Sequence, residues 1–267
     1  MIEIIKALIV GIVQGLTEFL PVSSSGHIVI AQEILGLQYS EEENLLFAIV
    51  LHFATALSTI VVFRKDILQI FQGLFQFKRN EEFLFSLKIV LSMIPAALVG
   101  VFLKDTLEEL FSNLRLVGFM LLITATLLFI ADRARNTGKD ISFKDSFIIG
   151  IAQAFAALLP GISRSGSTIS TSILLGDDKS KAARFSFLMV LPLILGATAK
   201  MYLDASEETA TSMNVEFLPL FIGFLAAFLS GLFACKWMIE FVKKAKLKYF
   251  SMYCILVGTF VIIYTFV

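Results

Sequence analysis

Two stretches of this sequence place serine, glycine and charged or amide side chains inside otherwise apolar surroundings. The first reads Gln14-Gly-Leu-Thr-Glu18-Phe-Leu-Pro-Val-Ser-Ser24-Ser-Gly-His27, and the second reads Gln153-Ala-Phe-Ala-Ala-Leu-Leu-Pro-Gly-Ile-Ser163-Arg164-Ser-Gly. Serine hydroxyls and glycine N–H groups donate hydrogen bonds to anions, and a planar guanidinium suits phosphate oxygens. A carboxylate and an imidazole add groups that accept protons. These residue types together indicate phosphate chemistry.

The two stretches are copies of one pattern. One inserted residue after the proline aligns Gly26 with Gly166 and Leu35-Gly36 with Leu175-Gly176. The sequence therefore contains an internal duplication, and its two polar breaks are expected to have related structures.

Each serine-rich break directly precedes a short apolar run that is expected to form a helix. The first turn of a helix has free N–H groups and a partial positive charge, so it binds anions. If the two breaks meet, both helix N-termini point into one cavity. The residues expected to bind an anion there are Gln14, Ser23, Ser24, Ser25, Gly26, Gln153, Ser163, Arg164, Ser165 and Gly166.

Arg164 gives the strongest individual signal, because a charge at bilayer depth costs about 2.5–3.5 kcal/mol even on the lenient insertion scale. The alternative is a structural partner for carbonyls at a helix end. Gln14 and Glu18 are four residues apart, so they share one helix face that is expected to look into the cavity. Interhelical hydrogen bonding is the alternative for Gln14 and Gln153, and a capped helix end is the alternative for Glu18.

The two histidines are expected to differ. His27 follows Gly26 at a helix start, where the helix dipole favours a neutral ring that can accept or relay a proton. His52 lies in an apolar stretch with no polar neighbours in sequence, and a hydrogen-bonded packing role is expected for it.

The composition is that of an integral membrane protein. Hydrophobic residues make up 57% of the 267 positions, charged residues only 16%, and the mean hydropathy is +0.86. The formal net charge is zero, which argues against a nucleic-acid partner and against a polybasic surface anchor.

Six stretches are long and apolar enough to cross a bilayer, for which about 20 residues are needed. They are Leu45–Phe63, Phe83–Leu103, Leu114–Ala131, Phe185–Leu203, Phe217–Trp237 and Tyr249–Val267. The segments Ile4–Leu37 and Phe143–Leu175 each consist of an apolar run, a Pro and Ser/Gly break and a run that is too short to span. We expect these two segments to be re-entrant helix-loop-helix hairpins.

Charges in the connections predict the orientation, because Lys and Arg are retained on the cytoplasmic side. Basic or mixed connections occur at 64–79, 133–144, 179–184 and 236–248, and acidic ones at 41–43, 105–109 and 204–216. They alternate in register with the six crossings, so the two hairpins must enter from opposite sides. The predicted fold is an all-α membrane protein with an inverted-topology repeat, in one domain (1–267) with halves of about 1–135 and 140–267.

Small residues recur at four-residue spacing in one crossing of each half. Ser92, Ala96 and Gly100 form one set, and the corresponding crossing contains Gly223, Ala227 and Gly231. Such spacing allows helices to approach closely, although small residues also recur by chance in apolar helices.

The two motifs closely resemble the signature regions of the undecaprenyl-diphosphate phosphatase family of the bacitracin-resistance type, and the resemblance extends over nearly the whole chain. It implies a bacterial plasma-membrane enzyme that removes the terminal phosphate of undecaprenyl diphosphate to regenerate the lipid carrier for peptidoglycan synthesis. It further implies an active site facing outside and help from a divalent cation such as Mg or Ca, and it allows a homodimer.

Carried over by position, the family's acidic motif falls on Gln14 and Glu18, its serine on Ser24, its histidine on His27, and its arginine on Arg164 beside Ser163. The first acidic position is Gln14 here, which removes one carboxylate. A cation held by Glu18 and by the diphosphate itself fits better than one held by two protein carboxylates.

The expected mechanism is attack of Ser24 on the terminal phosphorus, with His27 or Glu18 taking its proton and Arg164 stabilising the phosphate charge. A variant has Ser24 only binding and a metal-bound water attacking. The rival function is that of a lipid-phosphate flippase or secondary transporter, because inverted repeats with broken helices are also typical of transporters. Glu18, Ser24 and His27 within one break favour the enzyme.

Overall fold

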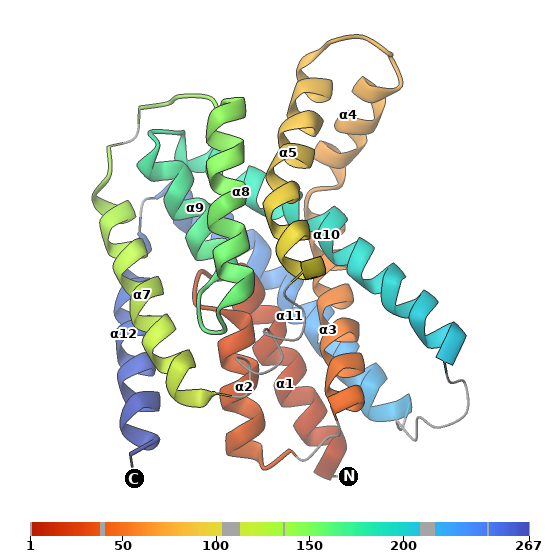
Figure 1. Cartoon of the computed structure of the whole chain (residues 1–267), viewed down its shortest axis with the longest axis vertical. Coiled ribbons are helices and arrows are strands. Elements are labelled where there is room, and N and C mark those ends of the chain that lie inside the picture. The colour runs from red at the N-terminus through yellow and green to blue at the C-terminus, as the bar shows by residue number, and fades with distance from the viewer. Residues whose placement is uncertain are drawn as a thin grey trace.

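A computed structural model describes residues 2–37, 41–102, 113–135, 137–208, 217–244 and 246–266. In these ranges the regular secondary structure is helical, as predicted, and Figure 1 shows its arrangement. The helices are α1 (Ile2–Phe19), α2 (Ser24–Leu35), α3 (Glu41–Val62), α4 (Arg64–Leu74), α5 (Glu81–Phe102), α7 (Leu114–Arg133), α8 (Phe143–Leu158), α9 (Arg164–Leu174), α10 (Lys179–Glu208), α11 (Phe217–Lys243) and α12 (Leu247–Tyr264).

Five of the described helices are each long and apolar enough to cross a membrane: α5, α7, α10, α11 and α12. Helix α3 meets the same test only together with α4, from which it is bent by 77°. The structure therefore has five candidate spans, or six if the bent pair is one span. Each of the six predicted crossings overlaps a helix, whereas Leu103, Val267, the predicted acidic connection 105–109 and positions 209–216 of another lie outside the described residues.

Helix α4 was not expected, because its residues were assigned to a basic connection. It begins at Arg64, and its apolar residues recur at helical spacing on one side, so it is amphipathic; two of them, Leu68 and Phe71, are exposed. Asp66 in its first turn pairs with Nε of Arg184 on α10 at 2.5 Å. A Cβ on Gly73 would lie 2.4 Å from a carbon of Glu82 on α5, so the two helices are in close contact.

The two polar breaks form the tips of two helical hairpins, α1–α2 and α8–α9. In each break a serine caps the second helix: the Ser23 hydroxyl accepts the N–H of Gly26, and the Ser163 hydroxyl accepts the N–H of Gly166. The α1–α2 tip points upward and the α8–α9 tip points downward in Figure 1. The tips therefore approach each other from opposite ends of the molecule.

Small residues let the first helix of each hairpin lie against a long helix. A Cβ on Gly11 would lie 2.4 Å from the Gly223 carbonyl of α11, and one on Gly15 would lie 2.4 Å from that of Ala227. A Cβ on Gly150 of α8 would lie 2.5 Å from the Ser92 carbonyl of α5. The predicted close approach is confirmed at these positions.

One part of that small-residue pattern has no contact of this kind. A Cβ on Gly100, near the end of α5, would meet no atom within 4 Å. The close approach on α5 therefore lies around Ser92.

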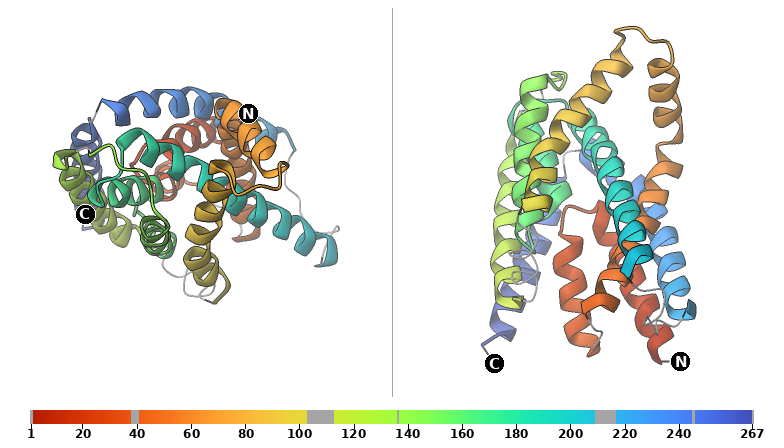
Figure 2. Two further views of the ribbon diagram at one scale, coloured as in Figure 1. Left: turned by 90° about the horizontal axis from the view of Figure 1, so that it is seen from above. Right: turned by 45° about the vertical axis from the view of Figure 1, so that its right-hand side comes forward.

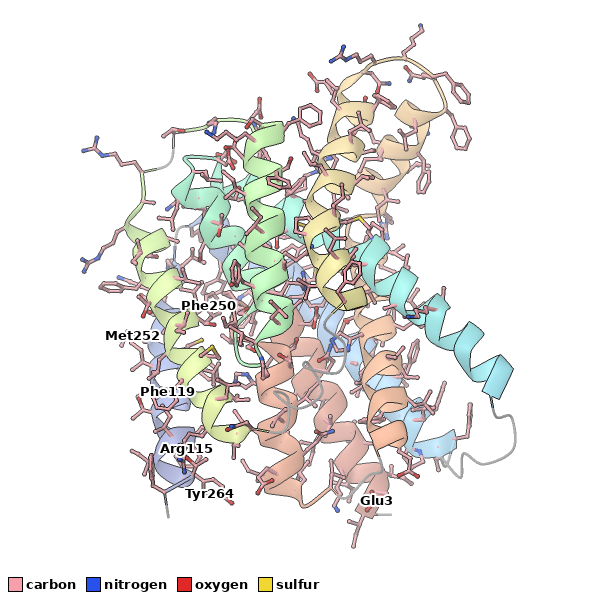
Figure 3. All side chains as sticks on the ribbon, viewed as in Figure 1. Glu3, Arg115, Phe119, Phe250, Met252 and Tyr264 are labelled. Carbon is pink, nitrogen blue, oxygen red and sulfur yellow. The ribbon has the colours of Figure 1, made fainter. Side chains whose placement is uncertain are left out.

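The outer surface is apolar along the long helices. Side chains such as Phe119 on α7 and Met252 on α12 point away from the bundle (Figure 3), with 48% and 60% of their surface exposed. Both ends of the chain lie at the lower end, and α4 lies at the upper end (Figure 2). The apolar surface fits a multi-pass membrane protein.

Candidate active site at the meeting point of the two hairpin tips

The two hairpin tips are in direct contact. The Ser165 hydroxyl donates to the carbonyl of Leu20 at 3.3 Å, and a Cβ on Gly26 would lie 3.2 Å from Cα of Gly161. A Cβ on Gly166 would be 3.3 Å from the carbonyl of Pro21. Glycine at these positions lets the two turns approach, so residues 140 positions apart share one site.

Glu18 is the centre of that site. Its Oε1 accepts from Arg164 at 2.5 Å, and its Oε2 accepts from the Ser24 hydroxyl at 2.7 Å and from Nε2 of Gln14 at 3.1 Å. Nε2 of His52 lies 3.7 Å from the same Oε2. The Glu18 carboxylate is almost fully buried, and a buried charge needs such partners.

Two polar atoms in the site are buried and have no hydrogen-bond partner within the described ranges. One is NH1 of Arg164, the second arm of the guanidinium fork, and the other is Oε1 of Gln14. Buried polar atoms are normally satisfied, so these two atoms are available to a ligand. A guanidinium with one arm on Glu18 and one arm free can still bind a phosphate oxygen.

The two helix starts have matching hydrogen bonds at their caps. With one residue more in the second turn, Ser23 corresponds to Ser163, Ser24 to Arg164 and Ser25 to Ser165. In both turns the capping hydroxyl lies 3.3 Å from the hydroxyl two residues later. The two repeated helix starts therefore place Ser24 on one side of the site and Arg164 on the other, with N–H groups and hydroxyls around them.

His27 makes contacts that sequence reasoning did not anticipate. Its Nδ1 lies 2.8 Å from the Ser23 carbonyl, and its Nε2 lies 2.8 Å from the hydroxyl of Tyr253 on α12. The two rings are stacked, with centroids 5.5 Å apart. Both ring nitrogens are thus engaged outside the Glu18–Ser24–Arg164 group.

Gln153 lies in different surroundings from its counterpart Gln14. Its Nε2 donates to the carbonyl of Ser92 at 3.5 Å, between α8 and α5. The position that matches Glu18 is Ala157, which is exposed. The second hairpin therefore lacks a carboxylate like Glu18, to which Gln14 donates a hydrogen bond in the first hairpin.

Two site residues were missed from the sequence. His52 has the hydrogen bond that was expected, from Nδ1 to the Ala48 carbonyl at 2.7 Å, but the expectation that no polar side chain lies near it is wrong, because α3 brings its Nε2 to Glu18. Tyr253 is 226 positions from His27 in sequence, and no local pattern marks it. A tyrosine in an apolar helix was the only available signal, because its hydroxyl needs a partner in a membrane.

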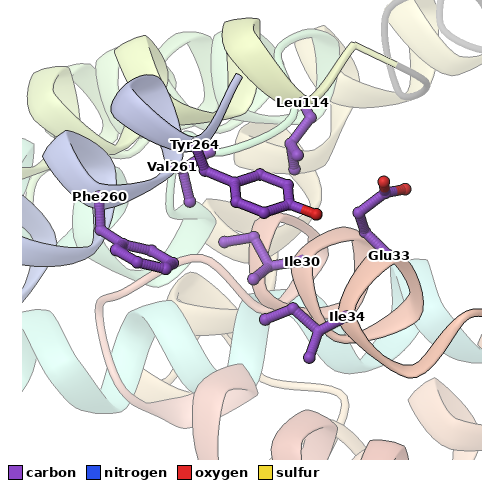
Figure 4. A pocket seen from close by; sticks show the side chains of 7 residues that line it. All are labelled: Ile30, Glu33, Ile34, Leu114, Phe260, Val261 and Tyr264. Carbon is purple, nitrogen blue, oxygen red and sulfur yellow. The ribbon is translucent and has the colours of Figure 1, made fainter. Parts of the chain in front are cut away.

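A groove lies between α2 and α12, beyond the His27–Tyr253 pair. Figure 4 shows its lining, which is apolar apart from a carboxylate and a phenol: Ile30, Glu33, Ile34, Leu114, Phe260, Val261 and Tyr264. His27 and Ile34 are seven residues apart, and so are Tyr253 and Phe260. Seven residues are two helical turns, so each pair shares one helix face. The groove is thus lined by the same faces of α2 and α12 that carry His27 and Tyr253.

Two oxygen donors at the site could contribute to binding a hard cation that shares its ligands with a phosphate. Within the described residues, no group of three or more His, Cys, Asp or Glu side chains could hold a metal by itself. The Glu18 carboxylate and the unpaired Oε1 of Gln14 are, however, oxygen donors of the kind that Mg²⁺ and Ca²⁺ prefer. Phosphate and water would complete such a shell.

Comparison with known proteins agrees with the resemblance seen in the motifs. The chain is 58% identical over 265 residues to an undecaprenyl-diphosphatase of Christiangramia forsetii, covering 99% of each chain. It is 52% identical to an undecaprenyl-diphosphatase of Bacteroides fragilis over 98% of each chain. It is 39% identical to undecaprenyl-diphosphatase 2 of Bacillus thuringiensis, over 98% of this chain and 97% of that one. The family model described as bacitracin resistance protein BacA matches residues 7–260, and the chain therefore belongs to the BacA family.

Proposed function

We infer that this protein hydrolyses undecaprenyl diphosphate to undecaprenyl phosphate and inorganic phosphate, and so recycles the lipid carrier of cell-wall synthesis and confers bacitracin resistance. Relatives that match it over almost their whole length are named undecaprenyl-diphosphatase. The observation that carries the inference is the group formed by Glu18, Ser24 and Arg164. It joins a nucleophile, a proton acceptor and a phosphate-binding fork within 2.5–2.7 Å contacts.

The proposed first step is attack of the Ser24 oxygen on the terminal phosphorus. The new Oγ–P bond forms as the bond from this phosphorus to the bridging oxygen breaks, and undecaprenyl phosphate leaves. Glu18 takes the proton, because its Oε2 already accepts the Ser24 hydroxyl at 2.7 Å. The free NH1 of Arg164 and the N–H groups of the two helix starts stabilise the charge on the phosphoryl oxygens.

In the second step, water attacks the phosphoserine. Glu18 returns the proton to the Ser24 oxygen and accepts one from the water, and inorganic phosphate is released. A divalent cation, held by Glu18 and Oε1 of Gln14, would neutralise phosphate charge when bound. The remaining binding residues of the two helix starts act by hydrogen bonding: Ser23, Ser25, Gly26, Ser163, Ser165 and Gly166.

The groove between α2 and α12 supports a lipid substrate. Its side chains are mostly apolar, and its one carboxylate, Glu33, would repel a diphosphate but not a hydrocarbon. Ile34 and Phe260 are 65% and 59% exposed, so the groove opens toward the bilayer. We propose that the first isoprene units lie there while the diphosphate lies at Arg164.

The proposed topology is an inverted repeat in which both hairpins are re-entrant. Its support is that the basic connections 64–79, 133–144, 179–184 and 236–248 belong to the end that carries α4, whereas the first hairpin enters from the other end. By the positive-inside rule, that hairpin faces outside in the bacterial plasma membrane. A homodimer is compatible with this arrangement.

Phosphate release by the purified protein in detergent tests the function. Wild type is expected to release phosphate from undecaprenyl diphosphate, Ser24→Ala to lose more than about 10³-fold in kcat, and the matched control Ser86→Ala on α5 to stay active. Rapid quenching with a substrate labelled in its terminal phosphate should trap label on Ser24. Full activity of Ser24→Ala would refute serine attack. A folded wild type that moves the lipid across vesicles without hydrolysing it would instead establish a carrier.

A further inference from the structure

The turn of the first hairpin holds a residue in an uncommon backbone conformation. Ser23 has φ 73° and ψ 94°, a region that side-chain-bearing residues rarely adopt. In the second hairpin the corresponding Ser163 is ordinary, at φ −70°, and Gly161 takes the positive φ of 95°. The first turn is one residue shorter, so the positive φ falls on the serine that precedes Ser24.

Such a conformation persists only where its surroundings fix it. Here the surroundings are unequal in the two hairpins. The Ser23 carbonyl accepts Nδ1 of His27 at 2.8 Å in addition to the His27 backbone N–H at 3.1 Å. The residue that matches His27 in the second hairpin is Ser167, whose hydroxyl has no partner within the described ranges. The hairpin with the strained turn is therefore also the one in which an imidazole binds the carbonyl of the strained residue.

The hydrogen bonds of His27 fix which nitrogen carries the proton. A carbonyl can only accept, so Nδ1 donates to Ser23. In the neutral ring Nε2 is then an acceptor, and it receives the hydroxyl of Tyr253 at 2.8 Å. Tyr253 is 42% exposed, and its hydroxyl has a partner because it is directed at His27.

We propose that Tyr253 and His27 connect the Ser23 turn to α12 by hydrogen bonds. This connection holds the turn in place and so orients the Ser24 hydroxyl toward the phosphate. In this assignment both are positioning residues that act through the Ser23 carbonyl. The proton of Ser24 goes to Glu18, which it contacts, and His27 takes no proton during turnover. The proposal rests on the proposed phosphatase activity and adds Tyr253 to its machinery.

Substitution of His27 separates positioning from proton transfer. Asparagine places an amide N–H near the position of Nδ1 and can donate to Ser23, but it cannot act as a base. His27→Ala is expected to lose about 30- to 100-fold in kcat with little change in KM, as the turn relaxes. His27→Asn should recover activity to within about tenfold of wild type. Folded protein is quantified by size exclusion and by the Tm in detergent, and rates are given per folded molecule.

Tyr253→Phe keeps the ring stack and removes the hydroxyl. We expect a loss of about three- to tenfold in kcat, with KM unchanged, and Tyr249→Phe on the same helix as an unaffected control. The double variant His27→Asn/Tyr253→Phe should be no worse than His27→Asn, because the contact is already lost.

Two results would overturn the positioning role proposed for His27 and Tyr253. One is a folded His27→Asn that is as inactive as His27→Ala, which would make the ring a proton-transfer group. The other is a fully active Tyr253→Phe. Both leave wild-type hydrolysis in place, whereas failure of the proposed function would remove activity from every variant, wild type included.

Discussion

The guanidinium of Arg164 does two things that a lysine ammonium cannot do together. One arm pairs with Glu18 at 2.5 Å, and the other, NH1, is buried and free. In Arg164→Lys a single nitrogen can keep the Glu18 pair only by leaving the phosphate without its donor. Removing one such preorganised donor costs about 2.7–4 kcal/mol of transition-state stabilisation, or about 10²–10³ in kcat. We therefore expect that loss with folding intact.

Arg164→Ala should have a second effect, on stability. It leaves the Glu18 carboxylate buried without its cation, and breaking a buried pair in this way costs about 3–5 kcal/mol. Adding Glu18→Gln removes the unpaired charge. The double variant Arg164→Ala/Glu18→Gln is thus expected to recover most of the lost thermal stability while it stays inactive.

The assay is the initial rate of phosphate release in detergent, together with the Tm of each variant. Arg184→Lys is the matched control, because Arg184 pairs with Asp66 on α4 at 2.5 Å and not with Glu18. The reasoning is refuted if Arg164→Lys retains kcat within about threefold of wild type. It is equally refuted if the double variant is no more stable than Arg164→Ala.

Three further outcomes follow from the site and its supports. Gln14→Glu adds a carboxylate ligand and should lower the Mg²⁺ concentration for half-maximal activity about tenfold in a metal titration after chelation; an unchanged midpoint would remove Gln14 from the cation site. Gly15→Ala should destabilise by about 1–3 kcal/mol in thermal melts, because its Cβ would lie 2.0 Å from an oxygen of α11, whereas Gly196→Ala in open space should not. Ile34→Trp should raise the KM for undecaprenyl diphosphate but not the KM for isopentenyl diphosphate, and Leu256→Trp at a lipid-facing position is the control. An equal rise for both substrates, or the same rise in Leu256→Trp, would exclude the groove as the binding site of the isoprene chain.

Much of the fold could be predicted because membrane spans depend on local composition. Apolar length located the five long candidate spans and α3, and the Pro and Ser/Gly breaks located both hairpin tips. Helix α4 was missed because its charges were interpreted as a connection, although Leu68 and Phe71 follow a helical period. Charge counting shows the side of a segment but not its secondary structure.

The site was predictable where its residues lie within one break, and less so where they come from other helices. Glu18 and Ser24 belong to one motif, and the repeat adds Arg164. His52 and Tyr253 come from helices whose packing no local pattern specifies. Gln153 shows the limit of the repeat: equivalent positions share a backbone, but their neighbours differ.

The contact of α1 with α11 and the Glu18–Arg164 pair have a consequence for synthesis of the chain. Arg164 is made 146 residues after Glu18. At about 5–20 residues per second this interval is about 7–30 s. During that time the carboxylate and amide of the opening helix have neither their cation nor their covering helix. The polar residues of the first hairpin therefore stay without these partners until the second half of the chain has been made.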